Sequence, residues 1–595
     1  MRRAAPTLRA LPRARGVVAH EHPGRTGRAA RKLRAAVAGL AALVLAGCTG
    51  LPSSGPVRQA APQIPAGYSV DVLAEGPAED AEPEQIVEGF LRAAAYGHGD
   101  NFSVASQYLA PGVEWDPLAQ VRIYAAEKSP VFATDASDGG ISVAVDQVAA
   151  VDDVGRYRVQ EPEEVSAAFT LVRTPEEEWR IAALEDGLLV SDVNFRQTFE
   201  MAPLYFLTRD FSATVPELRW YPQENRASHL VAGLLGGPSG WMDLGVTSAF
   251  PAGTELGRAG VVLNEGLATI NLTDAFLGAT DEEVALANAQ LEQTLAPLAE
   301  IGTIELQVRG STVNVPDFAV DLTLPQAAPG PVLIARGSVS RYSPGTGLQP
   351  ISGTPNLTDR APRNPAVPFE GVDAPRVVIA DGGRSLLTVP DDGSEPTVIF
   401  SGSELIAPSI DRYGFVWTAQ GGRPSEILAV RRDGVVMRID ATWLSGRILT
   451  DLRVAADGAR AVLVSTEDGV AHVEVVGVGR DALGRPRSLG EPLRIAEHME
   501  SVLDVSWVDQ TSLVLLGDTL DPADAARVHR ITIGGPATVL PLLPGGAAES
   551  EPVALTSNRN ERSVMVATSS GWLYTRSGAS WQLVVTGIAD PAYSG

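Results

Sequence analysis

The residue with the clearest chemistry in this sequence is its single cysteine, Cys48. A lone thiol excludes an intramolecular disulfide, a cysteine redox pair and a multi-cysteine metal site. It directly follows Leu45-Ala46-Gly47, and the small side chains before it leave room for a peptidase to cut between Gly47 and Cys48. The spacing therefore indicates a cleavage site that would leave Cys48 at a new N-terminus.

The residues before Cys48 support this interpretation. An apolar run of 12 residues spans residues 35–46, which is too short to cross a bilayer core that needs about 20. Five basic residues precede it, as in a secretion signal: Arg25, Arg28, Arg31, Lys32 and Arg34. Together the leader and Cys48 resemble a bacterial lipobox, which implies a lipid anchor at the extracytoplasmic face of the cell membrane. An ordinary secretion signal with an incidental cysteine and a non-cleaved anchor remain alternatives, and translation could start further in, near Val17.

Charge is divided sharply at Cys48. The chain carries −25 in all, and because residues 1–47 contribute +9, the remainder carries −34. Such a body is repelled by nucleic acids and by anionic lipid surfaces, so we expect no nucleic-acid partner. A lipid tether rather than surface charge would have to hold the protein at a membrane.

Local motifs for catalysis are missing from the rest of the sequence. Lys32 and Lys128 are the only lysines, and neither lies in a phosphate-binding loop. Lys128 stands in a polar stretch unsuited to a Schiff base. No G-x-S-x-G elbow occurs, and Ser239 follows a Gly-Gly-Pro turn that explains its presence better than nucleophilic chemistry. We therefore predict no catalytic residues and no cofactor.

Metal and sugar sites are weakly indicated. Five histidines follow the leader, and no two are spaced as a metal pair: His98, His229, His472, His498 and His529. The acidic stretches 135–140 and 391–393 lack the ligand spacing of a calcium loop and favour turns. The stretches 161–164 and 176–178 favour a solvated surface. Four tryptophans could line a sugar-binding face but more often pack between sheets: Trp417, Trp507, Trp572 and Trp581.

Residues 48–81 are rich in Pro, Gly, Ser and acids, which is typical of a flexible tether. An α+β domain is expected at residues 82–201, where an amphipathic helix from Glu82 and a short second helix precede a series of strands. Two of these strands are expected at Gly155–Val159 and Val165–Arg173. The pattern looks like the nuclear-transport-factor-like fold.

Residues 202–320 are expected to form an α/β domain. Helices are predicted at Arg226–Leu235 and from Asp281, and Val284, Leu291 and Leu295 would share the buried face of the second. The domain resembles the GerMN module through several short motifs: Leu234-Leu235-Gly236-Gly237-Pro238, Phe250-Pro251-Ala252-Gly253-Thr254, Asp274–Phe276, Gln293-Thr294-Leu295 and Val308-Arg309-Gly310.

Residues 331–595 repeat a strand, a polar turn and a second strand. Asp411, Asp457, Asp509 and Asn560 occupy equivalent turns, spaced by 46, 52 and 51 residues. Periods of about 40–50 residues are typical of four-stranded propeller blades. We expect an all-β propeller of about five or six blades, with a pair of β-sandwiches as the alternative.

The whole chain resembles the LpqB lipoprotein family of high-GC Gram-positive bacteria. The resemblance rests on Cys48 with Leu51-Pro-Ser-Ser54, the GerMN-like segment, Pro408–Trp417, Val502–Trp507 and the end from Trp581 to Gly595. It implies a non-enzymatic accessory protein that binds the extracytoplasmic domain of a sensor histidine kinase such as MtrB and serves envelope homeostasis. The residues leave open a glycan- or peptidoglycan-binding protein, an enzyme with a propeller pocket, and a lipid carrier that uses the first domain. They assign no binding face, ligand or oligomeric state.

Overall fold

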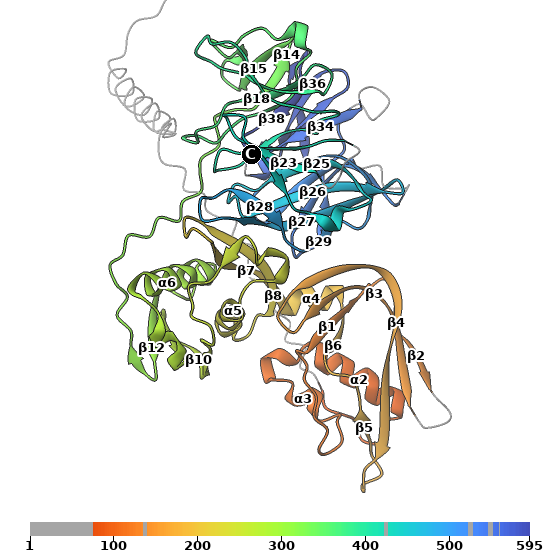
Figure 1. Cartoon of the computed structure of the whole chain (residues 1–595). Coiled ribbons are helices and arrows are strands. Elements are labelled where there is room, and N and C mark those ends of the chain that lie inside the picture. Colours follow the sequence, from red (N-terminus) through yellow and green to blue (C-terminus); the bar gives the residue numbers. More distant parts are fainter. Residues whose placement is uncertain (1–74, 135–139, 422–425, 522–526, 545–550, 559) are drawn as a thin grey trace, which may run out of the picture. The chain divides into compact units, whose positions relative to one another are not determined.

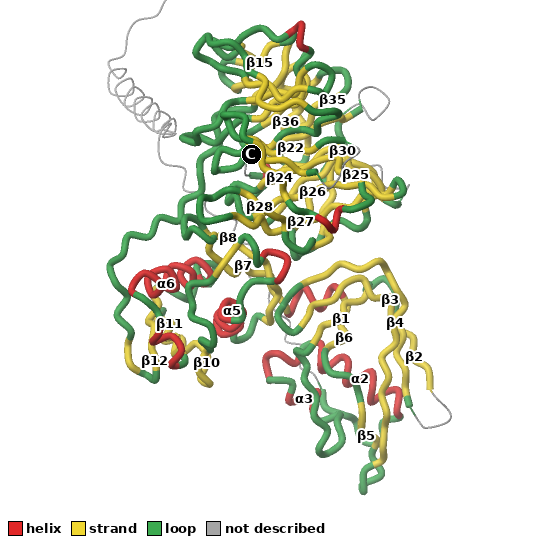
Figure 2. The backbone as a smooth tube through the Cα atoms, viewed as in Figure 1, coloured by secondary structure: helices red, strands yellow, loops and turns green. Residues whose placement is uncertain are grey.

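The computed structural model (Figure 1) describes residues 75–134, 140–421, 426–521, 527–544, 551–558 and 560–595. Gly47 and Cys48, the expected cleavage and lipidation site, lie outside these residues. In the part of the chain that is described, no helix is both long and apolar enough to cross a membrane. Strands greatly outnumber helices along the backbone (Figure 2).

The first domain is α+β, as expected. Its helices are α2 (Pro83–Ala95), η2 (Gly97–Asp100), α3 (Ser103–Ser106) and α4 (Asp192–Thr198). Its strands are β1 (Gln120–Tyr124), β2 (Val131–Thr134), β3 (Ile141–Asp152), β4 (Tyr157–Arg173), β5 (Trp179–Ala183) and β6 (Leu188–Ser191). They form a sheet in the order β5-β4-β3-β1-β6, with β2 paired to β3 and only the β1–β6 pair parallel.

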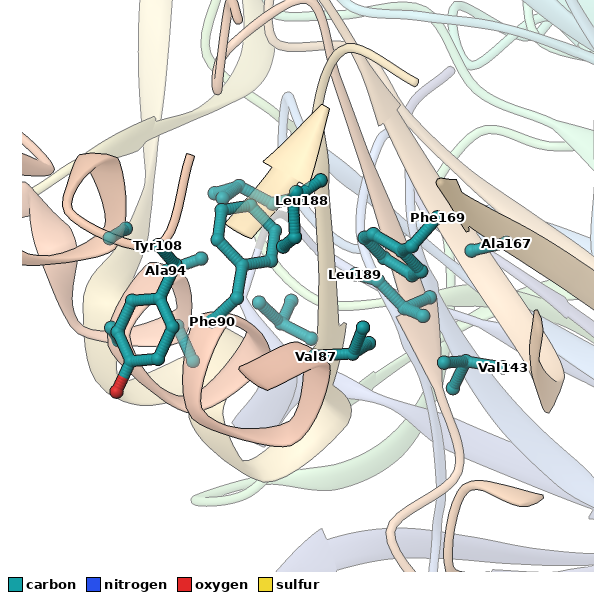
Figure 3. Packing of buried hydrophobic residues seen from close by; sticks show 14 of the residues in the cluster. Val87, Phe90, Ala94, Tyr108, Val143, Ala167, Phe169, Leu188 and Leu189 are labelled. Carbon is teal, nitrogen blue, oxygen red and sulfur yellow. The ribbon is translucent and has the colours of Figure 1, made fainter. Parts of the chain in front are cut away.

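Helix α2 covers this sheet with an apolar face. A capping box between Glu82 and Gln85 fixes its start. Phe90 and its helical neighbours then meet buried side chains of β3, β4 and β6, including Phe169 (Figure 3). Only a hollow of about 20 Å³ remains beside Phe90, so this part of the domain has no room for a lipid.

Strand β4 corrects one sequence prediction. Two strands were expected, at Gly155–Val159 and Val165–Arg173, with the acidic stretch 161–164 between them on a solvated surface. Instead the backbone continues as one strand of 17 residues. Its long antiparallel partner β3 absorbs the irregularity with a register shift between Gln147 and Ala149, which shows pairing overriding a local turn signal.

The second domain contains two small sheets and two main helices. Its helical elements are α5 (Arg226–Leu235), η3 (Gly240–Met242), η4 (Asp274–Gly278) and α6 (Asp281–Leu295). Its strands are β7 (Phe199–Thr208), β8 (Thr214–Pro222), β9 (Val246–Thr247), β10 (Leu256–Asn264), β11 (Leu267–Leu272), β12 (Thr303–Val308) and β13 (Ser311–Thr312). The sheets run β8-β7-β9 and β10-β11-β12-β13.

Helix α5 has the bounds that the sequence predicted, and α6 begins at the predicted Asp281. A capping box between Thr280 and Glu283 starts α6, and Val284, Leu291 and Leu295 are buried. The same helix also buries Gln290, whose side chain donates to the carbonyl of Tyr205 and accepts from the amide of Ala249. Hydrophobic periodicity could not reveal this polar contact between α6 and β7.

The third domain is the expected all-β propeller, and it has six blades. The blades are sheets of four or five strands, in the orders β16-β15-β14-β38, β17-β18-β19-β20, β21-β22-β23-β24, β25-β26-β27-β28 with β29, β30-β31-β32-β33 and β34-β35-β36-β37. The strands of the first three blades are β14 (Val332–Ala335), β15 (Ser338–Ser343), β16 (Gly347–Pro350), β17 (Arg363–Ala366), β18 (Val377–Ala380), β19 (Ser385–Thr388), β20 (Val398–Ser401), β21 (Ser409–Ile410), β22 (Val416–Ala419), β23 (Ile427–Val430) and β24 (Val436–Ile439). Those of the other three are β25 (Ile448–Val454), β26 (Arg460–Glu467), β27 (Val470–Arg480), β28 (Pro486–Leu489), β29 (Leu493–Ile495), β30 (Met499–Trp507), β31 (Ser512–Thr519), β32 (Val528–Thr532), β33 (Ala537–Val539), β34 (Pro552–Thr556), β35 (Met565–Thr568), β36 (Trp572–Ser577), β37 (Ser580–Thr586) and β38 (Ala589–Ala592). Three one-turn helices lie between strands: η5 (Thr358–Arg360), η6 (Thr442–Leu444) and η7 (Glu561–Ser563).

The repeated polar residues lie in the turns that the spacing predicted, between the first and second strands of their blades. Asp411 accepts from the amide of Phe415 and the indole of Trp417, both at 2.9 Å. Asp457 binds the guanidinium of Arg460 at 2.7 Å. The anchors therefore hold each turn by side-chain hydrogen bonds, which explains the period.

Strand β38 closes the propeller. It is contributed by the C-terminus and pairs antiparallel with β14, the first strand of the domain. A further bridge joins Ser594 to Val367 in the next blade. The end of the chain therefore latches the ring of blades to its beginning.

Candidate functional site

The axis of the propeller is a candidate site, because the inner strands of all six blades converge there. Contacts between successive inner strands, such as β25 with β30 and β30 with β34, form the ring. Among the described residues, six side chains on these strands accept a hydrogen bond from a backbone amide of the next blade: Ser409 from Val454 (3.0 Å), Asp451 from Val505 (3.2 Å), Asp504 from Leu555 (2.8 Å), Ser506 from Ser557 (3.1 Å), Thr556 from Tyr593 (3.0 Å) and Asp590 from Asn364 (3.0 Å). Polar side chains therefore fasten blade to blade around the axis.

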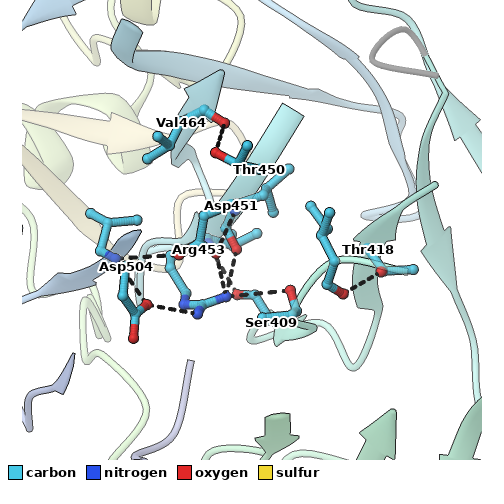
Figure 4. A network of polar contacts seen from close by, with 12 residues as sticks. Ser409, Thr418, Thr450, Asp451, Arg453, Val464 and Asp504 are labelled. Atoms are coloured by element: carbon cyan, nitrogen blue, oxygen red, sulfur yellow. Dashed lines mark hydrogen bonds and ion pairs between the residues drawn. The ribbon is translucent and has the colours of Figure 1, made fainter. Parts of the chain in front are cut away.

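Asp451, Arg453 and Asp504 form the charged part of this ring (Figure 4). Arg453 lies between the two carboxyl groups, with Nη1 2.8 Å from Asp451 and Nη2 3.2 Å from Asp504. Its guanidinium also donates to the carbonyl oxygens of Leu452 and Ala407. One cation thus serves two buried carboxyl groups from adjacent blades.

Burial dominates the protonation of Asp504. It raises the pKa of this carboxyl to about 8, and repulsion from Asp451 adds to the shift, while attraction to Arg453 opposes it. At neutral pH Asp504 therefore holds a proton for much of the time, which reduces the negative charge buried beside Arg453. A protonated carboxyl can act as a general acid when substrate reaches it.

The space beside this cluster is small. The cavity has about 90 Å³ and is lined by Arg453, Asp504, Trp507 and the C-terminal residues from Asp590 to Gly595. That volume holds a few water molecules, whereas small-molecule sites have about 300–1,000 Å³. Arg453 pairs with both Asp451 and Asp504, so the two carboxyl groups are engaged within the protein.

Ser239 is positioned by a buried ion pair in the second domain. Its hydroxyl donates to Glu217, which Arg219 holds at 2.9 Å. Arg219 also donates to the carbonyl of Gly237 at 2.8 Å, just beyond the end of α5. These contacts fix the turn at the end of α5, and the carboxylate that accepts from Ser239 is itself paired with Arg219, which favours the turn interpretation of the Gly-Gly-Pro-Ser motif.

The other polar candidates are dispersed. Lys128 is exposed and pairs with Asp146. His498 and His529 lie close, with ring centroids 5.7 Å apart, although their spacing in sequence gave no sign of it. Within the described residues, no group of three or more His, Cys, Asp or Glu could hold a metal ion.

The four tryptophans pack between strands and blades. Trp417 and Trp581 are buried, and Trp507 and Trp572 are partly buried against neighbouring core clusters. The indole of Trp507 donates to the carbonyl of Arg453 at 3.1 Å, and that of Trp581 to Pro541 at 2.7 Å. These side chains are held by the core, as the packing interpretation predicted.

Sequence reasoning missed the charged cluster at the axis. Asp504 lies in Val502–Trp507, which supported the family resemblance, but no role followed from it. Its partners Asp451 and Arg453 stand about 50 residues earlier, in the preceding blade. The available signal was an Asp at the inner strand of consecutive repeats, where apolar residues are the rule.

Comparisons with known proteins assign each domain. One family model, described as the N-terminal domain of lipoprotein LpqB, matches residues 76–196. A second, for sporulation and spore germination, matches residues 203–314. A third, the β-propeller domain of lipoprotein LpqB, matches residues 337–594.

Relatives match nearly end to end. The protein named lipoprotein LpqB from Cutibacterium acnes is 26% identical over 606 residues, covering 94% of this chain and 99% of its own. The LpqB of Mycolicibacterium smegmatis is 28% identical, covering 80% and 85%. Among solved structures, the tandem GerMN domains of the sporulation protein GerM from Bacillus subtilis match with 18% identity and a TM-score of 0.18, covering 23% of this chain and 56% of that one.

These relatives carry a name that denotes a lipoprotein and designates no enzymatic activity. The expected fold class is confirmed in all three domains by the strand order and by the family models. With all three family models in this order, and with relatives alike over most of its length, the chain belongs to the LpqB lipoprotein family.

Proposed function

We propose that this protein is a non-enzymatic accessory lipoprotein, which binds the extracytoplasmic domain of a sensor histidine kinase and modulates its signalling in the cell envelope. Its lipid would be attached to Cys48 after cleavage behind Gly47. The kinase partner, of the MtrB kind, comes from the family resemblance. Membership of a lipoprotein family supports the tether.

The observation that carries the proposal is the closed axis of the propeller. The carboxyl groups that could do chemistry are occupied by Arg453 and by backbone amides of neighbouring blades. The cavity beside them, about 90 Å³, is too small for a sugar ring. A latched ring of this kind favours a rigid scaffold that presents loops to another macromolecule.

The acidic body supports an anchor made by lipid rather than by charge. Residues 48–595 carry −34, which opposes adsorption to an anionic membrane. A thioether-linked diacylglycerol buries apolar chains at about 0.8 kcal/mol for each CH₂ group, enough to hold such a body at the surface. The tether would raise the local concentration of the protein beside a membrane-embedded kinase.

The test is a crosslinking pull-down from intact membranes, comparing wild type with Cys48→Ala. We expect a histidine kinase to be recovered with wild type and lost, at least tenfold, with Cys48→Ala. Thr49→Ala is the matched control, because it alters the neighbouring residue and keeps the thiol; it should recover the kinase like wild type. Mass spectrometry of the mature protein reports the lipid on Cys48 directly.

Two results would contradict the proposal. Recovery of glycan alone, with no kinase, would redirect attention to a glycan-binding role. If Cys48→Ala recovered as much kinase as wild type at equal surface abundance, the lipid tether would not be needed for binding the kinase.

A further inference from the structure

A second cavity, larger than the one at the propeller axis, is lined by residues of all three domains. It has about 290 Å³, near the lower limit for small-molecule sites. The N-terminal domain contributes the segment 156–158, the second domain 216–218 and 239–241, and the propeller Arg460 with segments 491–493 and 533–534. All of these residues belong to one compact unit, residues 72–595.

Direct hydrogen bonds hold the walls together. The indole of Trp220 donates to the carbonyl of Gly534 at 2.9 Å, and Gln510 donates to the carbonyl of Thr214 at 3.0 Å. Arg460, almost fully buried, donates to the carbonyl of Pro216. Because these bonds fix the walls, the cavity is preformed, which lowers the entropic cost of binding.

Five charged side chains line the cavity, Arg156, Arg158, Glu217, Arg460 and the exposed Glu491, and they differ in the partners that they have within the protein. Glu217 is held by Arg219 and Ser239, and Arg460 by Asp457. These charges have partners within the protein and help to shape the wall.

Arg156 differs from them. Its nearest carboxylate, on Asp152, is 3.8 Å from Nη1, and its buried Nε has no hydrogen-bond acceptor among the described residues. Arg158 also lines the cavity and is exposed, and it has no ion-pair partner among the residues that the structure describes. These two neighbouring guanidinium groups on a strongly acidic protein therefore share a single long ion pair, that of Arg156 with Asp152.

The rest of the lining is largely apolar, with Tyr157, Leu218, Trp241 and Ile533 among its residues. From this pattern we propose that the cavity binds a small amphipathic anion. Its carboxylate or phosphate group is accepted by Arg156 and Arg158, and its apolar or aromatic body packs against Trp241 and Tyr157. An arginine fork suits either anion.

Binding there joins the three domains, because each supplies part of the wall. A ligand that binds only the assembled cavity stabilises it by mass action. The inference stands apart from the kinase proposal: either can fail while the other holds.

The test uses the full chain in detergent micelles and three probes that share an aromatic body. Phenyl phosphate and 3-phenylpropionate carry the two anions, and benzyl alcohol carries none. We expect saturable quenching of tryptophan fluorescence by at least one anion, with affinity at least about tenfold above that for benzyl alcohol. Whichever of phenyl phosphate and 3-phenylpropionate binds more tightly shows whether the natural ligand carries a phosphate or a carboxylate.

Arg156→Gln should weaken the anion about tenfold or more and leave benzyl alcohol unchanged. Arg432→Gln is the matched control, because Arg432 pairs at 2.9 Å with the highly exposed Asp373 and does not line this cavity; it should bind like wild type. Trp241→Phe should remove most of the quenching while calorimetry still detects binding.

Arg158→Gln provides a second test if Arg156→Gln lowers the melting temperature. The inference is overturned if neither anion saturates below about 10 mM, which is weaker than ordinary millimolar binding. It is equally overturned if benzyl alcohol binds as well as the anions, or if both arginine variants bind like wild type.

Discussion

The centre of the N-terminal domain is apolar, whereas the centre of the propeller is polar. In the first, Phe90 and Phe169 meet beneath α2 and leave a hollow of about 20 Å³. In the second, Asp451, Arg453 and Asp504 fasten neighbouring blades around the axis. The N-terminal sheet is stabilised by apolar side chains packed against α2, whereas the ring of six blades is held by hydrogen bonds between blades. The two regions should therefore respond differently to mutation and to pH.

The largest effect should come from removing the latch. Deletion of residues 589–595 removes β38, together with the bonds from Tyr593 to Thr556 and from Ser594 to Pro368. Because the ring then opens, we expect a loss comparable with the whole stability of a domain, about 5–15 kcal/mol. Limited proteolysis should release propeller fragments while the N-terminal domain stays resistant.

Leu583→Ala serves as its control, because Leu583 is exposed on the outer strand β37 and should change stability by only about 0.5 kcal/mol. A protease-resistant propeller after the deletion would show that β38 is dispensable for closure.

Arg453→Met should have the next largest effect. It leaves Asp451 and Asp504 buried without their shared cation, and breaking a buried pair in this way costs about 3–5 kcal/mol. Chemical denaturation, followed by tryptophan fluorescence, measures the loss.

Arg432→Met is the matched control, since it breaks an exposed pair and should be almost neutral. If Arg453→Met were as stable as wild type, the charged cluster would contribute nothing to holding the blades.

The periodic features of the propeller could be predicted, whereas its axis could not. Asp411, Asp457 and Asp509 mark turns because each accepts a hydrogen bond from a backbone amide only two to four residues further along the chain. The contacts between Arg453 and Asp504 join residues 51 positions apart, and no local pattern contains that pairing. The sequence Ala589-Asp-Pro-Ala592 likewise lacks a strand signature and forms β38 only because β14 offers it an edge.

In the N-terminal domain, a helix could be predicted from the sequence, but the length of a strand could not. Helix α2 could be predicted because its apolar residues recur with helical spacing. The long strand β4 could not, because Pro162 and its acidic neighbours resemble a turn until β3 is present as a partner. Local signals therefore predicted elements, while pairing across the sheet decided their lengths.

Asp504→Asn should remove a pH dependence from the propeller. The pKa of Asp504 is raised from about 3.8 to about 8 in the folded protein. The folded state therefore retains a proton that the unfolded chain releases, and the stability contributed by this proton is lost as pH rises from about 4 to about 8. Thermal unfolding of wild type should show this decline, and Asp504→Asn should flatten it.

A variant with the same decline would mean that another group produces it. Stability that increases across the interval in wild type would contradict the direction of the shift.

His98 should produce a smaller effect of opposite sign in the N-terminal domain. Burial, followed by repulsion from His229, lowers the pKa of His98 from about 6.5 to about 4. Its ring lies between Phe102 and Phe199, and its Nε2 is buried without a partner among the described residues. The unfolded chain therefore binds the proton more readily, and stability falls as pH drops from about 6.5 toward 4.

Replacing His98 with Gln should flatten this decline, read from the melting temperature of the N-terminal domain. His472→Gln is a suitable control, because His472 lies in the propeller. If both domains lost stability in the same direction, the contrast between an apolar and a polar centre would not account for their pH responses.

The smallest effect is expected at Lys128. Its ammonium group is exposed and pairs with Asp146 on β3, far in sequence from the apolar residues of α2 that stabilise the domain. Solvent screens such a pair, and holding two side chains together costs entropy that offsets the attraction. Lys128→Ala should therefore unfold at the same denaturant concentration as wild type and retain kinase recovery in the pull-down. Loss of kinase recovery with unchanged stability would instead show that Lys128 is part of a binding surface on the N-terminal domain.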